Sequence, residues 1–286
     1  MYKKLQKALL TVAFCIGIAE PSLAHVIWFP AGQGGNQLWL SEFNDSSSIP
    51  YDTNGLYNLG SIGALDLSGN QIPLTISQSL TGPVSITTNA KEAALVATYD
   101  RAYWIRDDSA GFDVDHEDDH YLGYPTPDQV AAQGYDNVVH HLRSTTALSQ
   151  WSDIFAQPFN SSLGQSLQIV PLANPFALKS GDELPFKVYF NGKALSGTDP
   201  DVTFLSGYAG TTITPATSSN IYNVTIGANG LEPIEVDYST PETSNSPLTY
   251  YAASFTVTAV PEPSQLIGTI IAAIGVASFT RRRQRC

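Results

Sequence analysis

The sequence predicts an all-β protein with a β-sandwich body and one short helix. Short apolar runs follow one another from Val26 to Thr258, and clusters of Gly, Asn, Asp, Ser and Pro separate them. This is the pattern of strands joined by tight turns. Helical periodicity is nearly absent over the same stretch, so strands should form most of the regular structure.

The first half of the body is expected to hold a series of short strands. A hairpin turn, Asp-Leu-Ser-Gly-Asn, joins two of them at residues 66–70, because Asp, Gly and Asn favour tight turns. The expected strands are residues 26–29, 37–40, 62–67, 74–76, 84–86, 93–99 and 103–105.

One helix is expected after these strands. Thr126 suits the N-cap and Pro127 the first helical position, and apolar residues keep approximate helical spacing as far as Leu142. Gly134 weakens this segment, which leaves a broken helix as an alternative. On such a helix, Asp136 would lie one turn before His140, as an orienting carboxylate or as an ordinary surface partner.

A second run of strands follows Gly164, where we place a domain boundary. These strands have the alternation and turn spacing of an immunoglobulin-like sandwich. They are expected at residues 167–170, 184–190, 202–204, 221–224 and 250–258. The sequence therefore predicts two immunoglobulin-like sandwich domains, a β domain with the short helix over residues 25–163 and a second sandwich over residues 164–259.

The first 24 residues have the three parts of a secretory signal peptide. Lysines precede an apolar run at residues 8–19, and Ser22-Leu23-Ala24 forms a small-residue cleavage site. Cleavage there would make His25 the first residue of an exported protein.

The last segment, residues 260–286, combines three features in a fixed order. Pro261-Glu262-Pro263 leads into an apolar stretch at residues 265–280, and four arginines follow. This order closely resembles the PEP-CTERM sorting signal, which an exosortase recognises in bacteria that produce exopolysaccharide. The resemblance implies a C-terminal membrane helix and a place in the periplasm or cell envelope, with release to the surface as one outcome. An ordinary tail anchor is the alternative.

Charge and cysteine content narrow the function. Between the two terminal signals, seven Lys and Arg residues face 24 Asp and Glu residues, a net charge near −17. Such a surface repels phosphates, which excludes nucleic acid, and attracts cations. The two cysteines, Cys15 and Cys286, lie in the terminal segments, so any metal in the body must be held by nitrogen and oxygen ligands.

Three stretches carry short motifs: Ala24-His25 with the aromatic strand behind it, residues 97–104, and residues 167–197 with Asn174-Pro175, Gly181-Asp182 and Asn191-Gly192. Together they resemble a periplasmic β-domain family found beside nickel and cobalt uptake transporters. The resemblance implies a metal transporter as a partner.

The densest group of metal ligands is Asp113-Val-Asp115-His116-Glu117-Asp-Asp-His120. His116 to His120 has the His-Glu-x-x-His form of zinc peptidases, which needs both histidines on one helix. Crowded carboxylates and the Gly123 and Pro125 behind them oppose that helix. The alternating acids also suit calcium, although the glycine and final glutamate of an EF-hand are missing.

A nitrogen-rich site for nickel, cobalt, copper or zinc is the third alternative. After cleavage, the amino group and ring of His25 could chelate one ion, with His116, His120, His140 or His141 completing the shell. On a helix, His140 and His141 would be about 100° apart, so only one could join.

The sequence thus favours an exported cell-envelope protein that captures a divalent transition metal, nickel or cobalt, in support of uptake, and that is not an enzyme. The competing hypothesis is a structural, adhesive or carbohydrate-binding matrix protein. In that case Trp28, Trp39, Trp104 and Trp151 would be candidates for a sugar-stacking platform. A metallopeptidase or copper enzyme ranks last. The sequence contains no catalytic-serine elbow and no phosphate-binding loop.

Overall fold

The computed structural model describes residues 26–29, 37–41, 58–77, 84–105, 120–159, 163–196, 202–206, 213–215, 220–227, 234–241, 243 and 245–257. The strands are β1 (Val26–Trp28), β2 (Gln37–Ser41), β3 (Asn58–Leu65), β4 (Gln71–Ile72), β5 (Leu74–Ser77), β6 (Val84–Thr88), β7 (Ala94–Ile105), β8 (His120–Gly123), β9 (Val138–Leu148), β10 (Leu167–Pro171), β11 (Glu183–Phe190), β12 (Lys193–Ala194), β13 (Val202–Ser206), β14 (Ile213–Pro215), β15 (Tyr222–Thr225), β16 (Ile234–Thr240) and β17 (Leu248–Val257). The helix α1 spans Pro127–Gln133, and short 3-10 turns include η1 (Tyr135–Asn137) and η2 (Asp153–Ala156).

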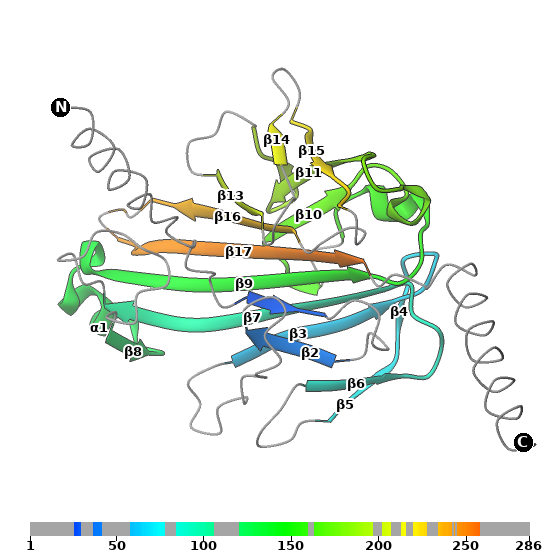
Figure 1. Cartoon of the computed structure of the whole chain (residues 1–286). Helices are drawn as coiled ribbons and strands as arrows, with labels where there is room; N and C mark the ends of the chain where they lie inside the picture. The colour runs from blue at the N-terminus through cyan, green and yellow to red at the C-terminus, as the bar shows by residue number, and fades with distance from the viewer. Residues whose placement is uncertain are drawn as a thin grey trace, which may run out of the picture.

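These strands form three sheets. A central sheet has the order β13-β16-β17-β9-β7-β3-β4, with β8 added beside β7. A second sheet has the order β10-β11-β15-β14, with β12 beside β11, and a third has the order β1-β2-β6-β5. Figure 1 shows the long strands β17, β9 and β7 side by side through the middle of the molecule. The predicted all-β sandwich fold is confirmed.

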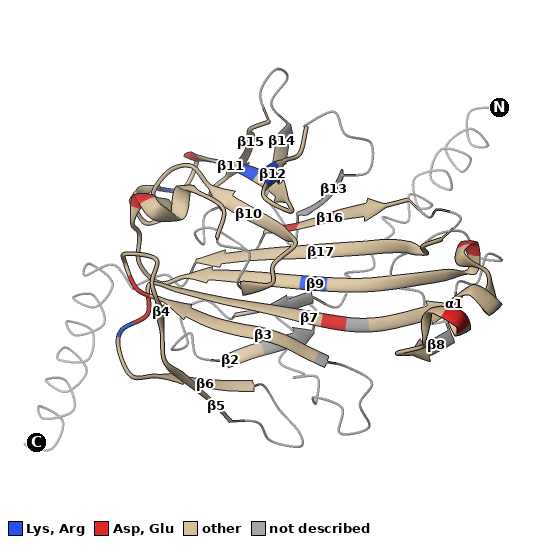
Figure 2. Ribbon diagram, turned by 180° about the vertical axis from the view of Figure 1, so that it is seen from behind, with Lys and Arg blue, Asp and Glu red and all other residues tan. Residues whose placement is uncertain are grey.

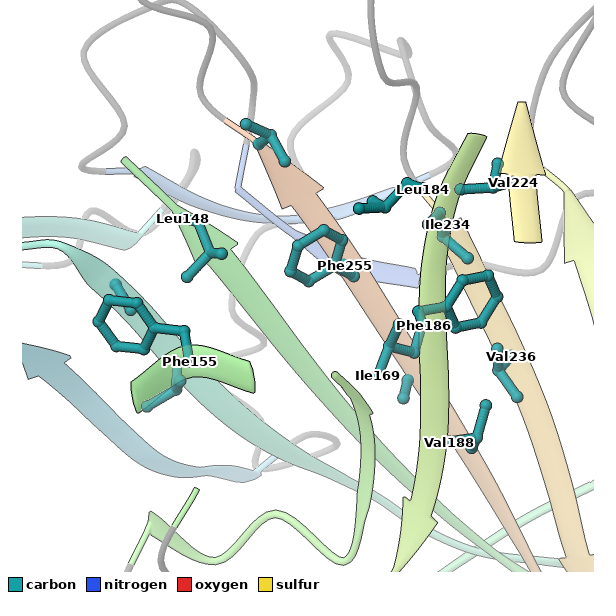
Figure 3. Packing of buried hydrophobic residues seen from close by; sticks show 14 of the residues in the cluster. Leu148, Phe155, Ile169, Leu184, Phe186, Val188, Val224, Ile234, Val236 and Phe255 are labelled. Carbon is teal, nitrogen blue, oxygen red and sulfur yellow. The ribbon is translucent and has the colours of Figure 1, made fainter. Parts of the chain in front are cut away.

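Both faces of the central sheet are covered over part of their area. On one face, Val96, Val236 and Phe255 pack against Ile169 and Phe186 of the second sheet; Figure 3 shows this core. On the other face, Leu95, Ala97 and Ala147 pack against the third sheet through a cluster that also contains Phe29, Leu38, Val84 and Ile86. Burial on both sides explains why long stretches of β9 and β17 are continuously buried.

The domain boundary expected near Gly164 does not separate the sheets. The central sheet joins β3, β7 and β9 from before that residue to β13, β16 and β17 from after it. The two halves are connected where β9 pairs with β17, a parallel pair in which Leu142 lies opposite Tyr251. One continuous sheet therefore carries side chains from both halves of the chain.

The expected turn at residues 66–70 is confirmed. The carboxylate of Asp66 accepts hydrogen bonds from the backbone N–H groups of Ser68 and Asn70 at 2.8 and 2.9 Å. Gly69 takes a φ of +77°, which glycine adopts without strain.

The expected helix exists but is shorter than the sequence predicted. Thr126 forms a capping box with Gln129, and the helix then ends at Gln133 because Gly134, with a φ of +88°, breaks it. The extension of the helix to Leu142 is wrong, since Val138 begins the long strand β9. Because both faces of β9 are buried, its apolar residues do not alternate strictly. Over a short window their spacing resembles that of a helix.

Among the helices in the described part of the chain, none has the length and hydropathy needed to cross a membrane. The expected signal peptide and the C-terminal apolar segment both lie outside the described residues.

Candidate functional site

His140 and His141 lie on opposite faces of the central sheet, because successive side chains of a strand alternate. The expectation that only one of them can serve a given site therefore holds, although the reason is strand alternation and not helical rotation. Each histidine belongs to a separate polar group.

On the His140 face, strand register brings together eight side chains that we call the platform. Tyr238, Tyr251, Leu142 and Asp100 form one row across β16, β17, β9 and β7, and Thr240, Thr249, His140 and Tyr103 form the next row. All eight are partly exposed. The platform lies at the border of the area that the second sheet covers, where Phe190 of β11 packs against Tyr238 and Tyr251.

A carboxylate orients the imidazole of His140. His140 Nε2 lies 2.9 Å from Oδ1 of Asp100, and the two side chains are 15% and 31% exposed. The ring of His140 also stacks on Tyr103, with centroids 4.0 Å apart and planes 7° from parallel. His140 is thus fixed in position by two neighbours while part of it stays accessible.

A bulge in β7 creates this arrangement. Asp100 and Tyr103 are three residues apart and would face opposite sides of a regular strand, but the register shifts between them. Ala102 takes a φ of +70°, and its N–H donates to Oδ1 of Asp100 at 2.8 Å. Tyr124 donates to the carbonyl oxygen of Asp100 at 2.9 Å. The bulge is therefore held by hydrogen bonds from both sides.

A cavity of about 110 Å³ adjoins the platform where the second sheet begins. Asp100, Leu142 and Tyr251 of the platform line it together with Ser144 and Ser166. The lining also includes Gly60, Thr98, Gly164 and Leu167. At Gly60 a side chain would collide with the hydroxyl of Thr98, so glycine allows β3 to lie close to β7 there.

The His141 face carries a buried ionic group. Arg143 Nη1 lies 3.7 Å from Oε1 of Glu235, and their side chains are 1% and 3% exposed. Ala252 lies between Arg143 and Asp237 in the register, and its small side chain leaves room for the arginine to cross β17. His141, Asp237 and Tyr250 are also buried on this face. Figure 2 shows the basic segment of β9 in the middle of the central sheet. The acidic segment of β7 in that view contains Asp100, which belongs to the platform and not to this group.

The negative charge of this group contributes to a raised pKa at Tyr250. Burial, and secondly the carboxylate of Asp237, raise the pKa of the Tyr250 phenol well above its ordinary value. The phenol therefore stays protonated at neutral pH. Burial raises the pKa of the platform tyrosines Tyr103 and Tyr251 as well; the charge of Asp100 adds to the shift at Tyr103.

Most of the expected metal ligands lie outside the described residues: His25, Asp113, Asp115, His116 and Glu117. For His120, the backbone is described at the start of β8, where it pairs with Ile105. Within the described ranges, no three His, Cys, Asp or Glu side chains are grouped so that they could hold a metal ion. The carboxylate hydrogen-bonded to His140 is Asp100, forty residues away in the chain, and not the expected Asp136.

Sequence reasoning missed Asp100, Tyr103 and Tyr251. Asp100 lay between the expected strands at residues 93–99 and 103–105 with no neighbouring ligand, and the bulge that pairs it with Tyr103 has no glycine to mark it. Tyr251 joins them only through the parallel pairing of β17 with β9.

The fold and this site define a class of protein: a layered β-sandwich whose central sheet leaves a polar and aromatic platform open on one face. A family model described as a domain of unknown function, DUF4198, matches residues 48–237, well over half of the 286 residues, and the chain belongs to that family. The match is consistent with the resemblance to a periplasmic β-domain family. No curated protein and no solved structure matches the chain.

Proposed function

We propose that this protein is exported to the cell envelope and captures a divalent transition metal, nickel or cobalt, in support of uptake. An exosortase would process the C-terminal segment, and a metal transporter would receive the ion. The observation that carries the proposal is the hydrogen bond between His140 and Asp100 on an open sheet face.

Imidazoles that bind metals usually donate their second ring nitrogen to a carboxylate, which fixes the ring and makes it a better ligand. His140 has this arrangement, with Asp100 at 2.9 Å and Tyr103 stacked on the ring. With Nε2 engaged by Asp100, Nδ1 is the nitrogen left to coordinate an ion. Imidazole with oxygen ligands suits nickel, cobalt, copper and zinc.

The strand pairing brings His120, the residue that follows the acidic segment in the chain, to the edge of the sheet next to β7. Residues 106–119 join the paired ends of β7 and β8, at Ile105 and His120. Ile105 in turn pairs with Val138, two residues before His140. Strand spacings of about 4.8 Å and a rise of about 3.4 Å per residue put the Cα atoms of His120 and His140 roughly 12 Å apart. At this separation the two histidines could share an ion only with both rings extended toward each other.

His141 is a weaker candidate. Its side chain is 4% exposed and shares its face with Arg143, whose positive charge opposes a bound cation. The strand β1, which begins one residue after His25, packs against β9 and β17. Phe29, next to β1, joins the cluster on the His141 face. A site that used His25 would therefore more readily include His141 than His140.

A peptidase function has less support. The His-Glu-x-x-His arrangement needs both histidines on one helix, whereas His120 begins the strand β8. A protein that binds and releases metal without chemistry fits this backbone better.

The test is calorimetric titration of the exported protein, with its N-terminus verified by mass spectrometry, against nickel, cobalt, copper, zinc and calcium. We expect nickel or cobalt to bind more tightly than about 10 μM, roughly −7 kcal/mol. Weaker binding of every transition metal, or binding of calcium alone, would overturn the proposal.

Variants locate the site. Asp100→Asn should weaken metal binding about 10- to 100-fold, as loss of an orienting carboxylate does, and His140→Gln should weaken it further. Asp136→Asn is the matched control, because Asp136 is exposed on η1 near His140 in the chain. Adding one residue before His25 tests the amino-terminal chelate. Unchanged affinity in that variant would exclude the chelate and leave the His140 site.

A structural or carbohydrate-binding role in the extracellular matrix is the second candidate. One observation favours it: the aromatic and hydroxyl side chains of the platform, which no metal site needs.

A further inference from the structure

We propose that the platform binds a neutral polysaccharide chain, with Tyr103 and Tyr251 as its stacking residues and Asp100 as its main acceptor. This binding site shares Asp100 with the proposed metal site but does not require a metal ion.

The rings come from four strands and lie next to one another. Tyr251 packs against Phe190 at 4.8 Å, and Phe190 packs against Tyr238 at 4.7 Å between ring centroids. Tyr103 lies in the next row of the platform, on the other side of β9, and stacks on His140 with centroids 4.0 Å apart. Each of these rings is partly exposed. Rings with one apolar face and a polar tip suit the mixed surface of a sugar.

The Tyr251 ring is held in place by its neighbours. Its centroid lies 4.8 Å from that of Phe190 and 6.4 Å from that of Tyr238, so the ring is packed between two other aromatic rings. A ring fixed before binding loses little entropy when a ligand stacks on it.

Polar groups surround the rings. Oδ1 of Asp100 accepts from Ala102 and lies against His140, whereas no group among the described residues donates to Oδ2. A sugar hydroxyl can donate to that oxygen. Ser166 lines the adjoining cavity with Tyr251 and adds a hydroxyl group there, whereas Ser144 Oγ already donates to the carbonyl oxygen of Leu167 at 2.6 Å.

The dimensions suit a chain more than a single sugar. Each row crosses four strands, which corresponds to three spacings of about 4.8 Å, or roughly 14 Å. The cavity of about 110 Å³ at the Asp100 end is small, so it would take a substituent or a terminal hydroxymethyl group and not a whole drug-sized ligand.

The negative charge of the protein favours a neutral polysaccharide over a polyanion. The body of the protein carries a net charge near −17, and the charged group described on the platform is the carboxylate of Asp100. Polyanions such as alginate would be repelled, whereas an uncharged chain meets no such barrier.

The tryptophans expected to form a sugar platform do not form this one. Trp104 packs with Val139 and Tyr250 on the His141 face, and Trp151 packs against the main core. The side chains of Trp28 and Trp39 lie outside the described residues. Tyrosines carry the proposal instead.

Affinity gel electrophoresis of the exported protein, in the presence of EDTA, tests the proposal. The gels contain dextran, galactomannan or hydroxyethyl cellulose as neutral chains, and alginate or hyaluronate as polyanions. We expect retardation by at least one neutral polysaccharide and none by the polyanions. EDTA removes metal, so this outcome is independent of the proposed metal capture.

Tyr251→Ala should weaken binding about tenfold, which corresponds to about 1.4 kcal/mol, and Tyr251→Phe should retain most of it because the ring remains. Tyr189→Ala is the matched control, since Tyr189 is a partly exposed tyrosine next to Phe190 that points to the other side of β11. Tyr103→Asn provides a second test if Tyr251→Ala lowers the unfolding temperature. Retardation by polyanions alone, no retardation by any neutral chain, or equal effects of the Tyr251 and Tyr189 variants would each overturn the proposal.

Discussion

Replacement of Arg143 by methionine should destabilise the protein strongly and in a pH-dependent way. Arg143 Nη1 and Glu235 Oε1 are 3.7 Å apart in a group whose side chains are almost fully buried. At an effective dielectric constant of about 20, unit charges at this distance attract by about 4.5 kcal/mol. Methionine fills a similar volume but leaves the carboxylates of Glu235 and Asp237 buried without their cation. We expect a loss of about 3–5 kcal/mol at pH 7.

The loss should shrink as the pH falls. In the variant, burial and mutual repulsion would raise the pKa values of Glu235 and Asp237 above their unfolded values near 4. An acid with a raised pKa in the folded state binds its proton more tightly there, so stability falls as pH rises from about 4 through the raised pKa. The difference between wild type and variant is therefore largest at neutral pH and smallest near pH 4.

Urea unfolding of both proteins between pH 4 and pH 8 measures this difference. Glu235→Gln should cost less than Arg143→Met, because the arginine then still faces Asp237. Lys187→Met, which removes a partly exposed lysine of β11, should change stability by no more than about 0.5 kcal/mol. An Arg143→Met protein as stable as the wild type at pH 7, or a loss of unfolding free energy that does not vary with pH, would refute the reasoning.

Three further changes test other parts of the fold. Gly60→Ala should lower the free energy of unfolding in urea by about 1–3 kcal/mol, because its Cβ would displace the Thr98 hydroxyl that accepts from the N–H of Ser61 at 2.8 Å. An unchanged urea midpoint would mean that the Thr98 side chain rotates away freely. Thr126→Ala should cost about 1 kcal/mol by removing the capping box of α1, and Thr126→Ser should restore it. The pKa of Tyr250 is raised in the folded protein, so the stability that this phenol contributes below pH 10 is lost as the pH rises further. Tyr250→Phe should therefore flatten the decline in unfolding free energy above pH 10. Identical slopes of unfolding free energy against pH in the two proteins would contradict the buried position of the phenol.

Several features of the fold were predictable from the local sequence pattern. The alternation of apolar runs with turn residues predicted the all-β fold, since that pattern has a period of two wherever one face is buried. The turn at Asp66 and the start of the helix at Thr126 were predictable because both depend on hydrogen bonds within a few residues. The helix end was not, because burial of β9 on two faces imitates helical spacing.

The candidate site depended on relations that a linear sequence does not show. The match to His-Glu-x-x-His drew attention to His120, but the backbone there is a strand, and the partner of His140 proved to be Asp100. A bulge at Ala102 turns Asp100 and Tyr103 to one face, and no glycine marks it.

By itself, the sequence determined the strand content, the turns, the helix start and the acidic charge, because these follow from neighbouring residues and composition. Only the tertiary structure decided which histidine meets which carboxylate. The parallel pairing of β9 with β17 places Tyr251 beside Leu142 and lets Arg143 reach Glu235, more than ninety residues away in the chain. Such pairings are set by the burial of whole sheet faces, to which every strand contributes.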